Sequence, residues 1–315
     1  MINLAEVKPQ QEEAVAGAVT TSADIKGRVI EFLWHLKKEG YSNSTIEDYG
    51  KCIKLLIKRG ANLFDGESVK GVIAKQESWG PATKLMTVAA YTIFASINGI
   101  AWKPPKYKAD RKLPFIPLES EIDALISSSG KKMSSILQLL KETGMRIGEA
   151  CQLKWVDVDL EHDTIAVNAP EKNGRPRTLK ISARLVAMLN ALTRENEYVF
   201  GRTKTRAASS YFCYLRKHVA NKLQNPRIKS IHLHTFRHWY ATMEYHKTKD
   251  ILHVMRKLGH RRIDNTLIYT QLVQYESDEY HSAVAENIDD AKKLIEAGFE
   301  YVCTHENHML FKKRK

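Results

Sequence analysis

Four prolines stand close together between Lys103 and Leu118, and they constrain the fold of this chain more than any other feature. Proline fixes φ and lacks an amide N–H, so this stretch cannot be a regular helix or a central strand. The 315 residues suffice for about two domains. We therefore predict a linker over 103–118, an N-terminal domain over 22–102 and a larger C-terminal domain. A leader over 1–21 lacks clear periodicity.

The residues before this linker have the apolar spacing of four short helices. The first follows the apolar positions of 25–36, which recur at helical spacing. The second begins at a capping box formed by Ser44 and Glu47. A third is expected over 66–76, and a fourth starts at Pro81, a residue suited to a first helical turn. Together they predict a small helical bundle.

The residues after the linker are mainly helical and contain one β-hairpin. The strands 164–167 and 178–181 flank the turn dipeptide Asn173-Gly174. In the tail, a helix is expected from about 278 to 295, followed by a hairpin of 299–302 against 309–311. The fold class is thus mainly α with a small β-hairpin or sheet. Helices are expected near 119–128, 133–142, 146–153, 182–193, 209–223, 235–246 and 249–258.

The chain is strongly basic. Lys and Arg number 49 against 36 Asp and Glu, which gives a formal net charge of +13 and a pI near 9.4. Such a field attracts polyanions, and nucleic acid is the commonest of them. Hydrophobic residues make up 43% of the chain, enough for a core in each domain, and this excludes a disordered protein.

The cysteines and the N-terminus indicate a cytoplasmic protein. The four cysteines are far apart and form no Cys-x-x-Cys pair, so redox dithiols and sulfur-rich zinc sites are not expected. The first 21 residues are polar, unlike a signal peptide. The most apolar stretch, Met86–Trp102, is too short and too polar to span a bilayer.

Three segments concentrate residues that bind anions or donate protons. In the first, a glycine turn places Arg146 at a helix start, where its guanidinium can hold two phosphate oxygens. In the second, His234 and Arg237 are three residues apart and share the N-terminal end of a helix. In the third, His260 follows a glycine, and Tyr269 comes nine residues later. Taken alone, Arg146 with Glu149 fits a surface salt bridge better than a catalytic site, and any one of the three segments is a weak signal by itself.

Taken together, these segments resemble the tyrosine recombinase family, which comprises integrases and Xer-type recombinases. That family combines Thr-Gly-x-Arg-x-x-Glu, His-x-x-Arg, Leu-Gly-His and a later tyrosine, and all four parts occur here in the same order. The resemblance covers about 119–274. It implies a core-binding domain over 22–102 that clamps DNA, a catalytic α+β domain over 119–277 and a C-terminal tail over 278–315.

The resemblance implies that this chain cuts and rejoins DNA without metal, cofactor or ATP. Tyr269 attacks a phosphodiester, forms a 3′-phosphotyrosyl link and releases a 5′-hydroxyl, which splits one difficult step into two easier ones. Because the bond energy stays in the new ester, no ATP is consumed. Tyr275 and Tyr280 compete for this role, but the distance of Tyr269 from Leu-Gly-His fits the family.

The other site residues take roles by the same resemblance. Arg146 and Arg237 hold the non-bridging oxygens, and His260 donates a hydrogen bond to one of them. His234 assists proton transfer from the tyrosine or donates to the phosphate. Lys172, in the hairpin turn, is the general acid for the leaving 5′-oxygen.

Two further assignments in this site come from the resemblance. Arg175 and Lys180 lie near Lys172 and compete for the role of the general acid. Glu149 is expected to orient a neighbour such as His234 through a hydrogen bond.

The expected partner is double-stranded DNA carrying a specific recombination site. Family members assemble as tetramers on two duplexes and are often monomers in solution, and the expected location is the nucleoid. The tail either packs on its own domain or, as is frequent in this family, docks on a neighbouring protomer. The linker is either a solvated spacer or a strap along DNA, and its basic residues are Lys103, Lys106, Lys108, Arg111 and Lys112.

Several alternatives remain at this point. His232, His234 and His238 cluster as zinc ligands would, although no acidic ligand has a convincing spacing. A silent DNA-binding regulator and a type IB topoisomerase are others. Within the recombinases, integration of a mobile element competes with Xer-type dimer resolution. The segment from Gly298 to the C-terminus is similar to tails of archaeal integrases, which favours an element-encoded archaeal integrase.

Overall fold

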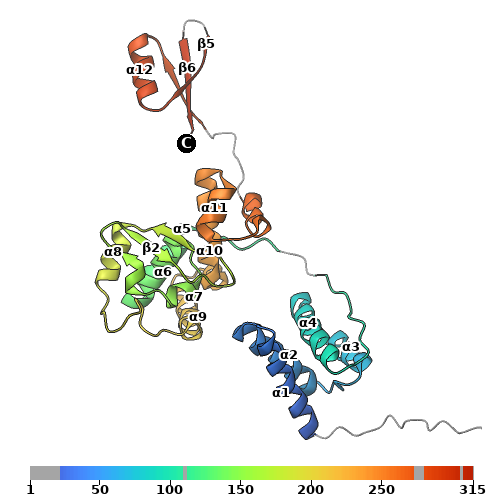
Figure 1. Cartoon of the computed structure of the whole chain (residues 1–315). Coiled ribbons are helices and arrows are strands. Elements are labelled where there is room, and N and C mark those ends of the chain that lie inside the picture. Colours follow the sequence, from blue (N-terminus) through green and yellow to red (C-terminus); the bar gives the residue numbers. More distant parts are fainter. Residues whose placement is uncertain (1–21, 109–111, 273–279, 306–307, 315) are drawn as a thin grey trace, which may run out of the picture. The chain divides into compact units, whose positions relative to one another are not determined.

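The computed structural model describes residues 22–108, 112–272, 280–305 and 308–314. These residues are mainly helical with two small antiparallel sheets, so the predicted fold class is confirmed (Figure 1). The chain divides into two compact units, one ending at Arg111 and the other beginning at Lys112. This boundary falls inside the proline-rich stretch, where neither helix nor strand forms among the described residues.

The N-terminal unit consists of four helices around one apolar core. Phe32, Ile53 and Phe94 are fully buried in it, and the buried Tyr91 donates its hydroxyl to the carbonyl oxygen of Leu63 at 2.8 Å. The helices are α1 (Ser22–Lys38), α2 (Asn43–Lys58), α3 (Gly66–Ala74) and α4 (Pro81–Ile97).

The cap of α2 differs from the predicted one. Ser42, not Ser44, is the N-cap, and its Oγ accepts a hydrogen bond from the amide of Thr45 at 3.3 Å. Because Ser42 is extended and the helix already begins at Asn43, Ser44 lies inside the first turn.

The second unit is built around α6 and α10, which pack against each other and bury a large apolar cluster. Leu137 and Leu140 on α6 meet Phe236 and Trp239 on α10 in that cluster. The seven predicted helices are all present, with bounds that differ by a few residues: α5 (Glu119–Ser127), α6 (Lys131–Thr143), α7 (Ile147–Cys151), α8 (Ala183–Asn190), α9 (Thr205–Lys222), α10 (Leu233–Thr248) and α11 (Ile251–Leu258). Short 3-10 turns η3 (Ile263–Asn265) and η4 (Leu267–Leu272) follow α11.

The predicted β-hairpin is confirmed and has a third strand. β2 (Thr164–Val167) pairs antiparallel with β3 (Arg177–Lys180), and β1 (Val158–Asp159) pairs with the other edge of β2. The turn dipeptide lies in the loop between β2 and β3, where the amide of Gly174 donates to the carbonyl oxygen of Glu171 at 3.1 Å. A two-residue strand such as β1 is too short to be recognised by alternation.

The tail contains the predicted hairpin, but its first part is a strand where a helix was predicted. β4 (Tyr280–Ala285) precedes α12 (Ile288–Glu296), and β5 (Glu300–His305) and β6 (His308–Arg314) form the hairpin, in the sheet order β4-β6-β5. β4 pairs along β6, which satisfies its backbone hydrogen bonds.

The reason for this correction is local. Ala285 is buried and Val284 is half exposed, the alternation of a strand that has one covered face. Asn287 then caps α12 by accepting from the amide of Asp290 at 2.9 Å, so the helix begins only at Ile288.

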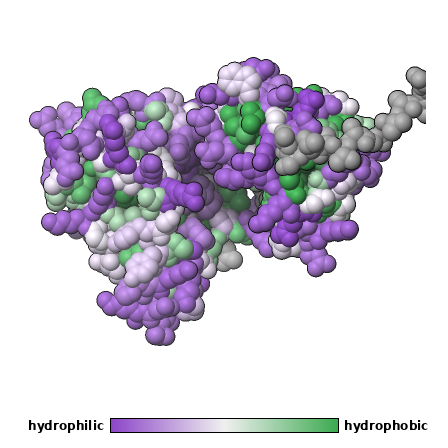
Figure 2. Space-filling model, turned by 90° about the horizontal axis from the view of Figure 1, so that it is seen from below, coloured by the Kyte–Doolittle hydropathy of each residue, from purple (hydrophilic) through white to green (hydrophobic). Residues whose placement is uncertain are grey.

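The visible surface is mostly hydrophilic, as expected for the strongly charged composition (Figure 2). All four cysteines are free thiols. Within the described ranges, no helix combines the length and the apolar character needed to cross a membrane.

Candidate active site

Arg237 connects the three segments singled out in the sequence. Its side chain projects from α10 and is only 2% exposed. One guanidinium nitrogen donates to the carbonyl oxygen of Gly144 at 2.7 Å, and another donates to that of Leu258 at 2.6 Å. Gly144 stands two residues before Arg146, and Leu258 stands two residues before His260. A single buried arginine therefore holds both loops beside the first turns of α10.

Glycines are required where α6 and α11 end beside this arginine. Gly144 and Gly259 cap these helices with φ of 60° and 66°, in the left-handed region that L side chains rarely adopt. A Cβ atom at Gly144 would clash with the ring of Tyr240, and one at Gly259 would lie 2.8 Å from the carbonyl oxygen of Arg175. The two glycines thus permit the sharp turns that bring Arg146 and His260 towards Arg237.

The buried carboxylate of Glu149 holds two arginines. It accepts from the amide of Arg146 at 2.9 Å and from the guanidinium of Arg146 at 3.1 Å. Arg177, at the start of β3, donates to both of its oxygens, at 2.6 and 3.3 Å. Burial alone would raise the pKa of Glu149, but the hydrogen bonds and charges of Arg177 and Arg146 outweigh it and lower the pKa.

Glu149 therefore orients neighbours through hydrogen bonds, as expected, but these neighbours are Arg146 and Arg177, and the expected partner His234 is wrong. The hydrogen bonds of this carboxylate in the described chain go to Arg146, Arg177 and the amide of Glu171. Its place one turn after Arg146 directs it towards the hairpin and not towards α10. Sequence reasoning missed Arg177, for which the only signal was a basic residue at the end of the hairpin loop.

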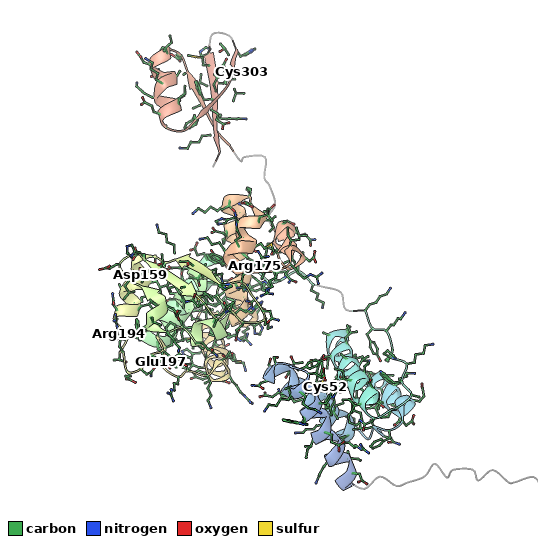
Figure 3. The ribbon with its side chains drawn as sticks, in the orientation of Figure 1. Cys52, Asp159, Arg175, Arg194, Glu197 and Cys303 are labelled. Atoms are coloured by element: carbon green, nitrogen blue, oxygen red, sulfur yellow. The ribbon has the colours of Figure 1, made fainter. Side chains whose placement is uncertain are left out.

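Lys172 lies in a loop that these groups fix at several points. The preceding residue, Glu171, donates its amide to Glu149 at 3.3 Å and accepts from Arg146 at 3.3 Å. Further along, the amide of Arg175 donates to the carbonyl oxygen of Gly259 at 3.0 Å (Figure 3, Arg175 labelled). Lys172 itself is exposed, with φ of 54°, and its charge acts on His234.

The two competitors for the lysine role lie on either side of this turn. Arg175 is part of the same loop, whereas Lys180 is at the far end of β3, where it pairs with Thr164. Lys172 lies between Glu171 and Arg175, whose hydrogen bonds fix the loop, and this position favours it over Lys180 for the role of general acid.

His234 and His260 are uncharged at neutral pH. Desolvation, followed by the charges of neighbouring groups, lowers the pKa of His234 to about 4 and the pKa of His260 to about 3, although the ring of His234 still reaches solvent. Arg237 and Arg146 are the main cations acting on His260, whose Nδ1 lies 2.9 Å from Thr266 Oγ1. A neutral imidazole can donate one hydrogen bond to an anion that enters here.

Positive charge dominates this cluster. Desolvation and the nearby Arg146 and Arg177 lower the pKa of Arg237 to about 9, because its charge is buried among like charges with Glu149 as the main opposing group. An anion placed against Arg146 and Arg237 would relieve that repulsion. A phosphate, with several acceptor oxygens, fits this need.

Tyr269 is buried beside the same cluster. It lies in η4, is 2% exposed, and packs against Ala241, Val254 and Leu258. Its hydroxyl oxygen is 3.1 Å from Nδ1 of His238. Burial raises the pKa of Tyr269, and the charges of Arg237 and Arg146 oppose that rise. Sequence reasoning assigned His238 only to a zinc cluster and missed this contact.

That zinc cluster does not form. His232 Nδ1 is 2.7 Å from a guanidinium nitrogen of Arg216, and His238 faces Tyr269. Within the residues that the structure describes, no group of three or more His, Cys, Asp or Glu could hold a metal ion.

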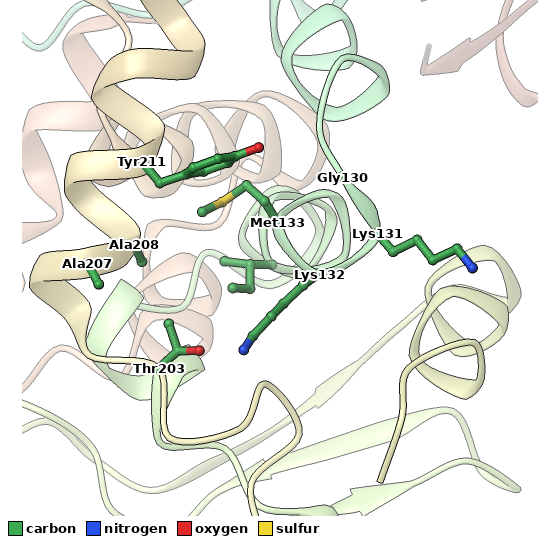
Figure 4. Close-up of a pocket in the computed structure, with 9 residues that line it drawn as sticks. Gly130, Lys131, Lys132, Met133, Thr203, Ala207, Ala208 and Tyr211 are labelled. Carbon is green, nitrogen blue, oxygen red and sulfur yellow. The ribbon is translucent and has the colours of Figure 1, made fainter. Parts of the chain in front are cut away.

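The remaining sequence candidates take no part in these contacts. Lys103, Lys106, Lys108 and Lys112 are exposed in the irregular linker, and Arg111 lies outside the described residues. A pocket of ≈ 400 Å³ opens between the first turns of α6 and α9 (Figure 4). None of the predicted site residues lines it.

Replacing Arg177 tests whether Glu149 depends on this counterion. We expect Arg177→Lys to lower the free energy of unfolding by about 1–3 kcal/mol, because lysine keeps the charge but cannot meet both carboxylate oxygens. Urea unfolding followed by circular dichroism measures the change, and Arg184→Lys, at an exposed position of α8, is the matched control. An Arg177→Lys midpoint equal to that of the wild type would contradict the assignment.

Two arginines, two neutral histidines, the loop of Lys172 and a buried tyrosine hydroxyl are thus brought together by α10. The model of the phage integrase family matches residues 118–276, and the chain belongs to this family. It is a tyrosine recombinase, a site-specific DNA strand transferase.

Relatives are similar over most of the chain. The tyrosine recombinase XerA of Thermococcus kodakarensis is 28% identical over 260 residues, covering 77% of this chain and 89% of the relative. XerA of Pyrococcus horikoshii is 26% identical over 262 residues, with shares of 77% and 88%. XerC of Xanthomonas campestris is 30% identical over 176 residues, which cover 52% of this chain and 53% of XerC.

Solved structures agree in fold. A lambda integrase tetramer bound to a Holliday junction has a TM-score of 0.62 at 14% identity, covering 81% of this chain and 80% of that one. The Tn1549 transposon integrase in complex with transposon right end DNA has a TM-score of 0.59 at 14% identity, with shares of 86% and 98%.

Proposed function

We propose that this recombinase cleaves and rejoins DNA strands through a covalent 3′-phosphotyrosyl intermediate formed on Tyr269. The observation that carries the proposal is the pair of hydrogen bonds from Arg237 to the carbonyl oxygens of Gly144 and Leu258. They gather the Arg146 and His260 segments around one buried cation, beside the helix that contacts the tyrosine hydroxyl.

In this mechanism the cationic groups stabilise the five-coordinate phosphorus. Arg146 and Arg237 hold the non-bridging oxygens, and each such pre-organised donor contributes about 10²–10³ in rate. His260 and His234, both neutral, donate a hydrogen bond each. Lys172 protonates the leaving 5′-oxygen, whose alkoxide is too basic to depart unaided.

Double-stranded DNA is the proposed substrate, and four copies of the chain act on two duplexes. Support comes from the net charge of +13 and from the fold shared with a lambda integrase tetramer bound to a Holliday junction. The helical bundle over 22–102 clamps the duplex, the catalytic domain over 119–277 acts on it, and the basic linker follows the phosphates. The enzyme works at the nucleoid of the cytoplasm.

The proposed biological role is integration and excision of an archaeal mobile element. The tail after 277 supports it, because its last residues are similar to tails of archaeal integrases. Xer-type resolution of chromosome or plasmid dimers is the second candidate, which the similarity to two archaeal XerA proteins favours. The two roles differ in where the recombination sites lie. Integration uses one site in the element and one in its host target, whereas dimer resolution uses one chromosomal or plasmid locus.

A nicked suicide substrate tests the proposed chemistry. When the strand piece carrying the 5′-hydroxyl diffuses away, religation is prevented and the covalent adduct accumulates. We expect wild-type protein to form a denaturation-resistant complex with its cognate site without added metal or ATP. Mass spectrometry of the digested complex should place the nucleotide on the peptide that contains Tyr269. A modified peptide without Tyr269 would overturn the assignment.

A further inference from the structure

His238 is the side chain that contacts the hydroxyl of the proposed nucleophile. Its Nδ1 lies 3.1 Å from the oxygen of Tyr269, and the two ring centroids are 5.9 Å apart with a tilt of 52° between the rings. The two residues come from different elements, α10 and η4, which pack against each other. A donor and an acceptor at this distance are within hydrogen-bond range.

The surroundings keep His238 in the form that accepts a proton. Burial first, and then the charge of Arg237, lower the pKa of His238, so the ring is neutral at pH 7. The raised pKa of Tyr269 means that its hydroxyl carries the proton. The proton therefore lies on the phenol oxygen. In the tautomer of His238 with hydrogen on Nε2, Nδ1 accepts a hydrogen bond from this hydroxyl.

Several charged groups on α10 and on the helices packed against it have partners. The side chains concerned are His253 of α11 with Glu244 of α10, and Lys141 of α6 with Glu119 and Asp123. The titratable groups that interact with His238 itself are His234 and Arg237 on α10 and Tyr269 on η4.

His234 is less suited to accept this proton. Among the described residues, no hydrogen bond joins it to Tyr269; its ring stands edge-on to that of His238, with the centroids 4.7 Å apart. It belongs instead to the cationic cluster, because Arg237, Lys172 and Arg146 all act on it. His234 therefore serves the phosphate, and a different group is left to serve the tyrosine.

We propose that His238 is the general base for Tyr269. As the tyrosine oxygen bonds to phosphorus, its proton moves to Nδ1 of His238, the P–O5′ bond breaks, and Lys172 protonates the departing oxygen. In the rejoining step a 5′-hydroxyl attacks phosphorus and gives its proton to Lys172, the P–O bond to Tyr269 breaks, and His238 returns its proton to the tyrosine oxygen. This inference rests on the proposed function and adds a catalytic residue to it.

Replacing His238 with glutamine distinguishes a role as general base from a role as a hydrogen-bond partner of Tyr269. Gln can accept a hydrogen bond from Tyr269 but cannot take up a proton near neutral pH. We expect His238→Gln and His238→Ala to slow single-turnover cleavage of the suicide substrate by about 10²–10⁴-fold. Added imidazole should partly restore cleavage by His238→Ala. The matched control is His246→Ala, a histidine exposed in the last turn of the same helix.

The pH profile gives a second readout. Wild-type cleavage should be level at neutral pH and should fall only on the acid side of the ordinary histidine pKa of about 6.5, because the pKa of His238 is lowered. Cleavage by His238→Gln should instead keep rising through pH 10, because the tyrosine must then ionise by itself and its pKa is raised above the ordinary value of about 10. A substrate with sulfur in place of the bridging 5′-oxygen should rescue Lys172→Ala but not His238→Gln, because thiolate leaves without a proton.

The outcomes separate the two proposals. A wild-type protein that forms no adduct would overturn the proposed function. A wild-type protein that forms the adduct, together with a His238→Gln rate within threefold of it from pH 6 to 8, would overturn the role of His238 alone. If His238→Gln unfolds at a lower temperature than the wild type, cleavage by His238→Ala with and without imidazole is the deciding measurement. Cleavage restored by imidazole supports His238 as the general base. A cleavage rate that imidazole leaves unchanged refutes that role.

Discussion

Tyr269→Phe should form no covalent complex with DNA under any condition in which the wild type does. The substitution removes one oxygen, and with it the only atom proposed to attack phosphorus. The phenyl ring keeps its packing against Ala241, Val254 and Leu258. Binding to the recombination site should remain within about threefold of the wild type, because the phosphate contacts come from other residues.

The same substitution should have a small effect on stability. It leaves Nδ1 of His238 without its hydroxyl partner, a loss of about 1 kcal/mol. Denaturing gels measure the adduct, and filter binding and thermal melting check affinity and folding. Tyr275→Phe and Tyr280→Phe are the controls, because the sequence offered these two tyrosines as alternative nucleophiles. An adduct formed by Tyr269→Phe would remove the nucleophile from the mechanism.

Much of the fold could be read from local sequence. Apolar spacing, proline at the first turn of α4 and the turn dipeptide before β3 each fix an element within a few residues of themselves. The prediction for β4 was wrong because the strand that it pairs with, β6, lies more than twenty residues later in the chain. Its small residues fit a helix equally well, and only the non-local ladder decides between the two.

The candidate site shows the same division between local and non-local information. Arg146, His234, Arg237 and His260 are marked by short motifs with fixed spacing. The contact between His238 and Tyr269 joins residues 31 positions apart.

The Glu149–Arg177 pair is non-local in the same way. It joins residues 28 positions apart. No spacing in the sequence indicates such pairs, because they depend on how η4 and the hairpin pack against α10 and α7. The motifs therefore identify which groups meet the phosphate, and the packing identifies which groups position or deprotonate them.

Arg237→Met should reduce cleavage by at least 10²-fold while leaving the DNA-free protein nearly as stable as the wild type. The loss of rate follows from removing a pre-organised donor to the phosphate oxygens. For stability, two opposing effects are of similar size. The carbonyl oxygens of Gly144 and Leu258 lose their partner, at about 1–3 kcal/mol each. The buried charge is also removed, and the pKa of Arg237 at about 9 corresponds to a relief on the order of 4–5 kcal/mol.

The wild type and Arg237→Met should differ in melting temperature more clearly with DNA bound than without it. A bound phosphate compensates the charge of Arg237, so site DNA should raise the melting temperature of the wild type more than that of Arg237→Met. Thermal melting with and without a nicked duplex measures this, and Arg184→Lys serves as the control. Cleavage by Arg237→Met within tenfold of the wild type, or equal stabilisation of both proteins by DNA, would mean that Arg237 only holds the two loops together. Slow cleavage together with weaker stabilisation by DNA would mean that burying the charge of Arg237 destabilises the free protein, and that a bound phosphate compensates this loss.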